Sequence, residues 1–567
     1  MTVAPETPAT APPGTPPAGT PPAGAAASRW IGAAWLLGGF CATLPFTIQL
    51  FRYGDEWWHI ALGRLILSSG IPAKEPFSFV ATQHPWVEQQ WLYEVALATL
   101  VRIGGDGLAS LALGLVGSLA LLVAALAVPR RASISRGWCA AAMVLGALMA
   151  GMALGVRAET VSALGVALTL LIVVRWRDGN RWVVWLLPPL FLLWANLHAG
   201  FIAGLALLAF TLVIHRPARR RPGVAVSPGT SLAVICVGAA AAAVLLGLVA
   251  GAAVLVLLWA AFRPVPVDPG VTRRPLAIAT AAAAALTLVN PAGLGLYGYI
   301  AETFGNPLLS QLVSEWQSPN FHDTLTKLIA VVAALLVLVW LVGRRPRVPD
   351  ILLSTAAFLF TLQAVRNVSL FAVVAIPQLA EYGAAAWKER GPLPLQRRLG
   401  ARLPIPLAVV AALAVSGASI AVAAPQTSSS AAAQFEQTHE PASAADYVAA
   451  HFPGQRLLSS DSDAGYLAYR FPSGRVVFVY DEIGIFGTGR LTDYLDVATI
   501  SGDWRTLLAR YELRHAILGV GSADTSALIQ LGWSVDCYDA ASGRVVMSAG
   551  GVPPSATPPP PSDAPAC

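Results

Sequence analysis

The sequence predicts an all-α polytopic membrane protein that carries a small α/β domain near its C-terminus. First, 56% of the 567 residues are hydrophobic and only 12% are charged, whereas soluble domains carry about 25% charged residues. Second, apolar stretches long enough to cross a bilayer recur between residues 30 and 424. Third, charge returns after residue 424, where short strand-like and helical segments alternate.

These composition changes divide the chain into five parts. Residues 1–28 are rich in Pro and Ala, and we expect a disordered cytoplasmic tail there. Residues 29–424 form the predicted transmembrane domain, with a large first outer loop at 51–105. A flexible linker at 425–440, an extracytoplasmic α/β domain at 441–550 and a disordered tail at 551–567 follow.

The transmembrane domain contains about 11–13 predicted spans. Eleven lie near 30–50, 106–128, 137–155, 159–174, 181–197, 200–215, 275–290, 326–343, 350–364, 368–384 and 403–424. The stretch 231–262 is too long for one helix, and Gly247 and Gly251 allow a tight hairpin there, which brings the number to 13.

The basic residues predict the orientation of the chain, because Lys and Arg accumulate in cytoplasmic loops. When the first span starts inside and the hairpin is included, the inner segments hold 22 of the 37 basic residues. The N-terminus is then cytoplasmic, and the first loop and the C-terminal domain are extracytoplasmic. The net charge of +6 therefore reflects orientation signals, and we expect no nucleic-acid partner.

With this topology, the scarce polar residues of the spans gather at the outer side. They are Arg157, Asn196, His198, Asn290, Glu315, Arg366 and Asn367, and the first outer loop adds Asp55, Glu56 and His59. Polar groups within a bilayer are costly and tend to mark function. The sequence thus predicts a charged cavity that opens outward.

Such a cavity suits chemistry on a substrate that a lipid delivers. Arg366 and Arg157 could pair with a lipid-linked phosphate. Asp55 could deprotonate an acceptor hydroxyl or, with His59 four residues later on the same helical face, hold a divalent cation such as Mg²⁺ or Mn²⁺. Trp58 could stack on a sugar or anchor the loop at the headgroup level.

The layout resembles that of GT-C-type glycosyltransferases, which have many spans, an acidic motif in a large first outer loop and a soluble C-terminal domain. More closely, several phrases resemble a bacterial set of GT-C-like membrane proteins. They are "DEWWHIALGRLILSSGIP", "EPFSF", "WVEQQWLYE", "WANLHAGF", "NPAGLGLY", "EWQSP", "AVRN" and, in the terminal domain, "DAGYLAYRF".

The resemblance implies a bacterial inner-membrane enzyme that acts on the extracytoplasmic face. Protein O-mannosyltransferases, lipid A aminoarabinose transferases and oligosaccharyltransferases have this layout and take sugar from a polyprenyl-phosphate-type carrier. The acceptor here would be an envelope glycan, lipid or protein. The acid/base role is carried over to Asp55 and its neighbour Glu56, and Glu75 stands where an aspartate is expected before Pro76.

Most of these residues also have a purely structural interpretation. Arg366 could pair with Glu315, Arg157 with Glu159, and His198 could cap a tight turn. Glu88 and Glu94 fall in a segment that resembles an amphipathic interfacial helix, so we expect both at the surface.

Two other functions remain open from the sequence. A transporter or flippase of a lipid-linked glycan would need polar groups near mid-membrane and inverted repeats, and neither is evident. A non-catalytic envelope assembly protein would not depend on Asp55. Cys537 and Cys567 could form a disulfide outside the cell. The chain has no C-x-x-C motif and no cysteine spacing typical of a metal site, and we expect both cysteines as free thiols.

Overall fold

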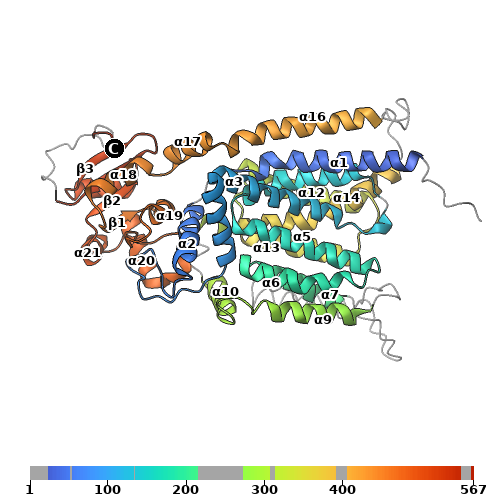
Figure 1. The fold of residues 1–567 in the computed structure, drawn as a ribbon, viewed down its shortest axis with the longest axis horizontal. Helices are drawn as coiled ribbons and strands as arrows, with labels where there is room; N and C mark the ends of the chain where they lie inside the picture. Colours follow the sequence, from blue (N-terminus) through green and yellow to red (C-terminus); the bar gives the residue numbers. More distant parts are fainter. Residues whose placement is uncertain are drawn as a thin grey trace, which may run out of the picture.

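The computed structural model describes residues 23–51, 54–132, 134–214, 272–306, 313–390, 405–550 and 564–567. The molecule is elongated, with a helical bundle toward one end of its long axis and the C-terminal domain at the other (Figure 1). The predicted hairpin at 231–262, residues 1–22 of the first tail and residues 551–563 of the second lie outside the described residues.

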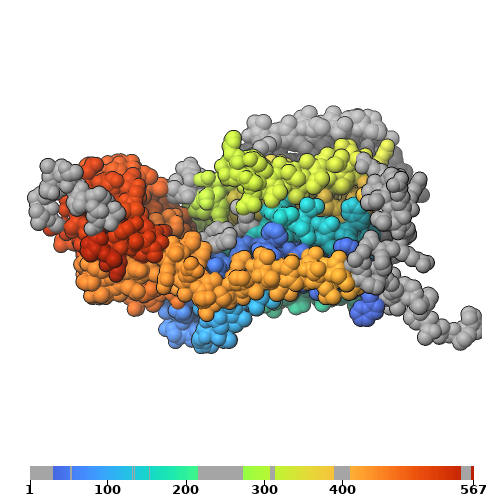
Figure 2. All heavy atoms as spheres, turned by 90° about the horizontal axis from the view of Figure 1, so that it is seen from above, coloured from blue at the N-terminus to red at the C-terminus, as the bar shows by residue number. Residues whose placement is uncertain are grey.

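The bundle consists of helices that run roughly along the long axis (Figure 1). They are α1 (Ala23–Thr47), α3 (Trp91–Leu126), α4 (Arg136–Ala150), α5 (Ala158–Arg177), α6 (Leu187–Leu197), α7 (Phe201–Ile214), α9 (Arg273–Leu286), α12 (Thr324–Val342), α13 (Val348–Gln363), α14 (Val368–Arg390) and α16 (Ile405–Ala423). Among the described residues, six helices are long and apolar enough to cross a membrane, which confirms a multi-pass membrane protein. Figure 2 shows α16 lying along the outside of the bundle.

The predicted span at 106–128 matches the second part of α3. The element Trp91–Leu126 is not one straight helix, because a kink separates a first helix from the span. The two parts are joined at Gly104 and Gly105, whose backbone leaves the helical region. Gly105 has φ +66°, which a residue without a side chain adopts at little cost.

Three short elements lie at the bundle end that faces the C-terminal domain. They are α2 (Asp55–Ser69), α10 (Gly295–Gly305) and the 3₁₀ turn η4 (Ser314–Trp316). A second turn, η5 (Val365–Asn367), joins α13 to α14 at the same end. The backbone N–H of Val365 donates to the carbonyl of Gln317 at 2.9 Å and so holds the η4 segment against η5.

The terminal domain has a four-stranded sheet with order β1-β2-β4-β3. Its strands are β1 (Leu457–Ser459), β2 (His515–Gly519), β3 (Ser534–Asp539) and β4 (Arg544–Ser548). Only the β1–β2 pair is parallel. Helices α17 (Ser429–His439), α18 (Ala442–His451), α19 (Asp461–Arg470), α20 (Gly487–Ala498), α21 (Trp504–Arg510) and α22 (Ala523–Gln530) and the turn η7 (Ile483–Ile485) complete it.

Two local predictions for this region are wrong. The expected strand at 475–480 makes only isolated bridges through Val477, one to Ser78 and one to Leu457. The side chains of residues 476–480 are buried, so this apolar run contributes to the hydrophobic core and not to a strand ladder. The expected flexible linker at 425–440 is largely α17.

The expectation of free terminal thiols is also wrong. Cys537 of β3 and Cys567 form a disulfide that closes a separation of 30 residues. The N–H of Tyr538 donates to the carbonyl of Pro565, and the N–H of Cys567 donates to the carbonyl of Tyr538. The last residues of the predicted disordered tail are therefore held against β3.

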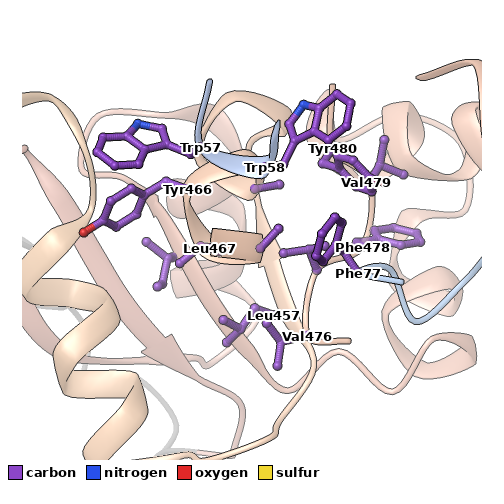
Figure 3. Close-up of a cluster of buried hydrophobic side chains, with 14 of the residues drawn as sticks. Trp57, Trp58, Phe77, Leu457, Tyr466, Leu467, Val476, Phe478, Val479 and Tyr480 are labelled. Carbon is purple, nitrogen blue, oxygen red and sulfur yellow. The ribbon is translucent and has the colours of Figure 1, made fainter. Parts of the chain in front are cut away.

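Helix α2 shares a hydrophobic core with the terminal domain, as Figure 3 shows. The ring of Trp57 lies 5.1 Å from that of Tyr466, and the ring of Trp58 lies 5.6 Å from that of Tyr480. Both tryptophans are buried, and burial of each aromatic removes about 150–250 Å² from water. The first loop and the terminal domain are thus packed as one unit at the end of the bundle.

Candidate functional site

A network of ion pairs lies where α2, α5 and η4 meet. Arg157 precedes α5, and its guanidinium group forms a two-pronged pair with the carboxylate of Glu315; Nη2 lies 2.6 Å from Oε2. Nη2 also lies 3.6 Å from Oδ2 of Asp55, and Nε lies 3.6 Å from Oε2 of Glu159. One largely buried arginine therefore serves three carboxylates from three elements, and its side chain is only 8% exposed.

Arg366 extends this network from η5. Its Nη2 donates to Oε1 of Glu159, the same carboxylate that faces Arg157. Its guanidinium carbon lies 4.8 Å from the ring centroid of Trp316, an arrangement that favours a cation. Glu159 thus bridges the two arginines, and Asp55 and Arg366 belong to one connected site.

Each arginine has a structural partner, but the pairs differ from those expected. Arg366 meets Glu159 rather than Glu315, and Arg157 meets Glu315 as well as Glu159. These bonds would make the arginines structural unless a ligand competes for them. The carboxylates remain 18–34% exposed, so water reaches this network.

Asp55 and Glu56 begin α2, where carboxylates are favoured by the helix dipole. The Asp55 side chain is 34% exposed and faces Arg157. Glu56 is buried, with 2% of its surface exposed. Consecutive helical residues point about 100° apart, so of these two carboxylates Asp55 is the accessible one.

His59 is not placed as the sequence predicts. It is buried, and its Nδ1 lies 3.1 Å from Oε1 of Glu94 and 3.2 Å from the amide nitrogen of Gln90. Desolvation lowers its pKa to about 3, so the ring is neutral at pH 7. The expected surface position of Glu94 is therefore wrong, and Glu88, only 3% exposed, is buried as well.

The expected metal pair of Asp55 and His59 does not fit this arrangement. The His59 ring is engaged by Gln90 and Glu94. Within the described ranges, no group of three or more His, Cys, Asp or Glu side chains is arranged to hold a metal ion.

Two other predicted substrate contacts have structural roles. Nδ1 of His198 lies 2.6 Å from the Ser162 hydroxyl and accepts the N–H of Gly200 at 3.1 Å, so this residue caps the turn after α6. Trp58 is 3% exposed and packs against Trp86 and Tyr480, out of reach of a sugar.

Glu75 organises the first loop rather than the network. It is fully buried and accepts the N–H groups of Phe77 and Ser78. The Tyr480 hydroxyl of the terminal domain donates to it at 3.2 Å. Desolvation raises the pKa of Glu75 to about 6.

The terminal domain adds carboxylates that sequence reasoning missed. Asp481 lies beside Gly54, the residue before Asp55, and the charge of Asp55 helps to raise the pKa of Asp481. The carboxylate of Glu482 accepts a hydrogen bond from the hydroxyl group of Tyr299 in α10, at 2.5 Å. Desolvation raises the pKa of Glu482 to about 7, with a further contribution from the charge of Asp55. The available signal was "YDEIG", an acidic pair directly after a buried apolar run.

This arrangement combines a partly exposed carboxylate with two arginines at one end of an apolar bundle. The carboxylate can accept a proton, and the arginines can hold an anion such as phosphate. A small neighbouring pocket, with room for about one water molecule, lies among Trp58, Glu88, Tyr299 and Glu482. The site can therefore bring a phosphate and a proton acceptor together.

The comparisons with known proteins concern the fold. No protein-family model and no curated protein sequence matches the chain. An oligosaccharyltransferase structure from Archaeoglobus fulgidus, tethered with an acceptor peptide, matches 87% of this chain and 70% of its own, with 14% identity and a TM-score of 0.50. ArnT from Cupriavidus metallidurans bound to undecaprenyl phosphate matches 94% of this chain and 100% of its own, with 15% identity and a TM-score of 0.45.

The oligosaccharyltransferase match shows that the two chains share a fold. At this identity, similarity extends to the arrangement of the chain and not to the reaction. The chemistry must therefore be argued from the site.

Proposed function

We propose that this protein is a membrane glycosyltransferase that moves a sugar from a polyprenyl-phosphate-type carrier to a cell-envelope acceptor. The observation that carries the proposal is the network of Asp55, Arg157 and Arg366 at one end of a membrane-spanning bundle. Its position suits a carrier whose chain lies in lipid and whose phosphate lies at the surface. The chain shares its fold with an oligosaccharyltransferase, and the residues of the network carry the argument for the chemistry.

Arg157 and Arg366 bind the carrier phosphate in this proposal. Their present partners, Glu315 and Glu159, are carboxylates that match the same planar donor geometry. The phosphate exchanges with one or both carboxylates on binding. Two fixed positive charges then stabilise the leaving phosphate in the transition state.

Asp55 acts as the general base. It takes the proton from the acceptor hydroxyl as the acceptor oxygen bonds to the anomeric carbon of the sugar. The bond between that carbon and the phosphate oxygen breaks, and its electron pair leaves with the carrier phosphate. The 34% exposure of the Asp55 side chain gives an acceptor access to it.

The distribution of basic residues supports placing this site on the extracytoplasmic face of a bacterial inner membrane. The acceptor is then a glycan, lipid or protein of the envelope. No step of the proposal requires a divalent cation, because Arg157 and Arg366 supply the positive charge at the phosphate.

The test is transfer of radiolabelled sugar from defined lipid-linked donors by the purified protein in lipid. We expect Asp55→Asn to lose at least about 100-fold in turnover, the usual contribution of a general base, while carrier binding remains. Glu302→Gln is the matched control, because Glu302 is an exposed carboxylate on neighbouring α10; its turnover should equal that of the wild type.

The same experiment separates the rival functions. If Asp55→Asn transfers sugar as fast as the wild type, the assigned base is wrong. If the wild type moves lipid-linked glycan between leaflets of a vesicle without transferring sugar, the flippase function replaces the proposal. If it does neither while envelope assembly requires it, the non-catalytic function is correct.

A further inference from the structure

The terminal domain approaches the start of α2 unusually closely. A Cβ atom built on Gly465 of α19 would lie 2.3 Å from the carbonyl oxygen of Gly54. A Cβ atom on Gly54 would lie 2.4 Å from the carbonyl oxygen of Ser462 and 2.8 Å from Oδ2 of Asp481. These distances are too short for any side chain, so the two glycines allow the two backbones to meet.

This approach brings a second carboxyl group to the proposed base. Oδ2 of Asp481 would lie only 2.8 Å from a Cβ atom on Gly54, and Asp55 is the next residue in the chain. An ionised carboxylate has no hydrogen to donate. A hydrogen bond between two carboxyl groups therefore requires that one of them keeps its proton.

The surroundings favour Asp481 as the group that keeps it. Desolvation and the charges of Asp55 and Asp461 raise the pKa of Asp481 well above its usual range, and Glu315 contributes in the same direction. On the other side, Asp55 faces the positive charge of Arg157 at 3.6 Å.

We propose that Asp481 is a positioning residue whose carboxyl group donates a hydrogen bond to Asp55 and fixes the orientation of the base. This proposal rests on the proposed function, and it adds that the transferase site is complete only when the terminal domain is seated on α2. Asp481 itself touches no reacting atom. Its role is to hold one Asp55 oxygen so that the other faces the acceptor.

Two substitutions of Asp481 distinguish positioning from general packing. Asparagine has a similar shape and a permanent N–H donor, so Asp481→Asn should keep turnover within about threefold of the wild type. Leucine cannot donate, so Asp481→Leu should lower kcat about 10- to 100-fold, the loss expected when a base is poorly oriented. Donor KM should change little in both, because Arg157 and Arg366 are untouched.

A glycine pair tests the seating of the domain. Gly465→Ala should lower kcat, because the added methyl group displaces α19 from Gly54. Gly489→Ala in α20 is the control, since nothing lies within 4 Å of its Cβ position. Melting temperature measured on all four variants identifies any that fail to fold.

An infrared measurement separates failure of this inference from failure of the proposed function. The wild-type protein at pH 7 should show a protonated carboxylic-acid band that disappears in Asp481→Asn. If that band is present but the wild type transfers no sugar, the hydrogen bond is correct and the transferase function is wrong. An absent band, or an Asp481→Leu variant with wild-type kcat, overturns the positioning role.

Discussion

Replacing Arg157 by methionine should destabilise the protein more than any surface ion pair would. Methionine keeps most of the volume but leaves the carboxylates of Asp55, Glu159 and Glu315 without their shared cation. Removing one partner of a buried pair costs about 3–5 kcal/mol. Because these carboxylates are 18–34% exposed and partly solvated, we expect a loss of about 2–3 kcal/mol.

The assay is thermal unfolding in detergent, supported by chemical denaturation where it is reversible. Arg510→Met is the control, because Arg510 and Asp493 form a pair 59% and 24% exposed, worth at most about 1 kcal/mol. Adding Glu315→Gln to Arg157→Met should recover about 1 kcal/mol by removing one uncompensated charge. The reasoning is refuted if Arg157→Met and Arg510→Met lose equal stability, or if Glu315→Gln worsens the first variant.

Three further changes test separate parts of the fold. Desolvation raises the pKa of buried Glu440 to about 7, so between pH about 4.5 and 7 the folded state binds more protons than the unfolded state. The free energy of unfolding therefore falls as pH rises through this range. The melting temperature should fall with it, and Glu440→Gln should make that fall smaller. Cys537→Ser opens the 30-residue disulfide loop and should cost about 3 kcal/mol, a loss that reductant should reproduce in the wild type and leave unchanged in the variant. Gly63→Ala places a methyl group 2.1 Å from a backbone oxygen of α3 and should lower stability by about 1–3 kcal/mol, unlike Gly489→Ala.

The sequence indicated the bundle side of the site because lipid makes ionisable residues rare. Ionisable residues are conspicuous in an apolar chain, as are Asp55, Arg157, Glu315 and Arg366 here. The topology predicted from the distribution of Lys and Arg places all four on the same side of the membrane. The structure joins them through ion pairs. Which carboxylate each arginine meets depends on the contact between η4 and η5, which lie almost 50 residues apart and have no local pattern to specify it.

The terminal-domain side could not be found by the same argument. Acidic residues are common in soluble segments, so nothing in the sequence around Asp481 and Glu482 distinguishes them as residues that face the bundle. Trp58 looked like a headgroup or sugar contact because tryptophan is common in such places. Its burial, like that of neighbouring Trp57, depends on the docking of the terminal domain, a contact between residues about 400 positions apart.

The most direct test of the account is a structure of the protein in lipid with a bound polyprenyl phosphate. We expect the phosphate within hydrogen-bond distance of Arg157 or Arg366, with Glu315 or Glu159 displaced from its arginine. Asp55 should still lie beside the bound phosphate. A phosphate bound at the opposite end of the bundle, near Arg347 and Glu381, with the Asp55 network unchanged, would contradict it.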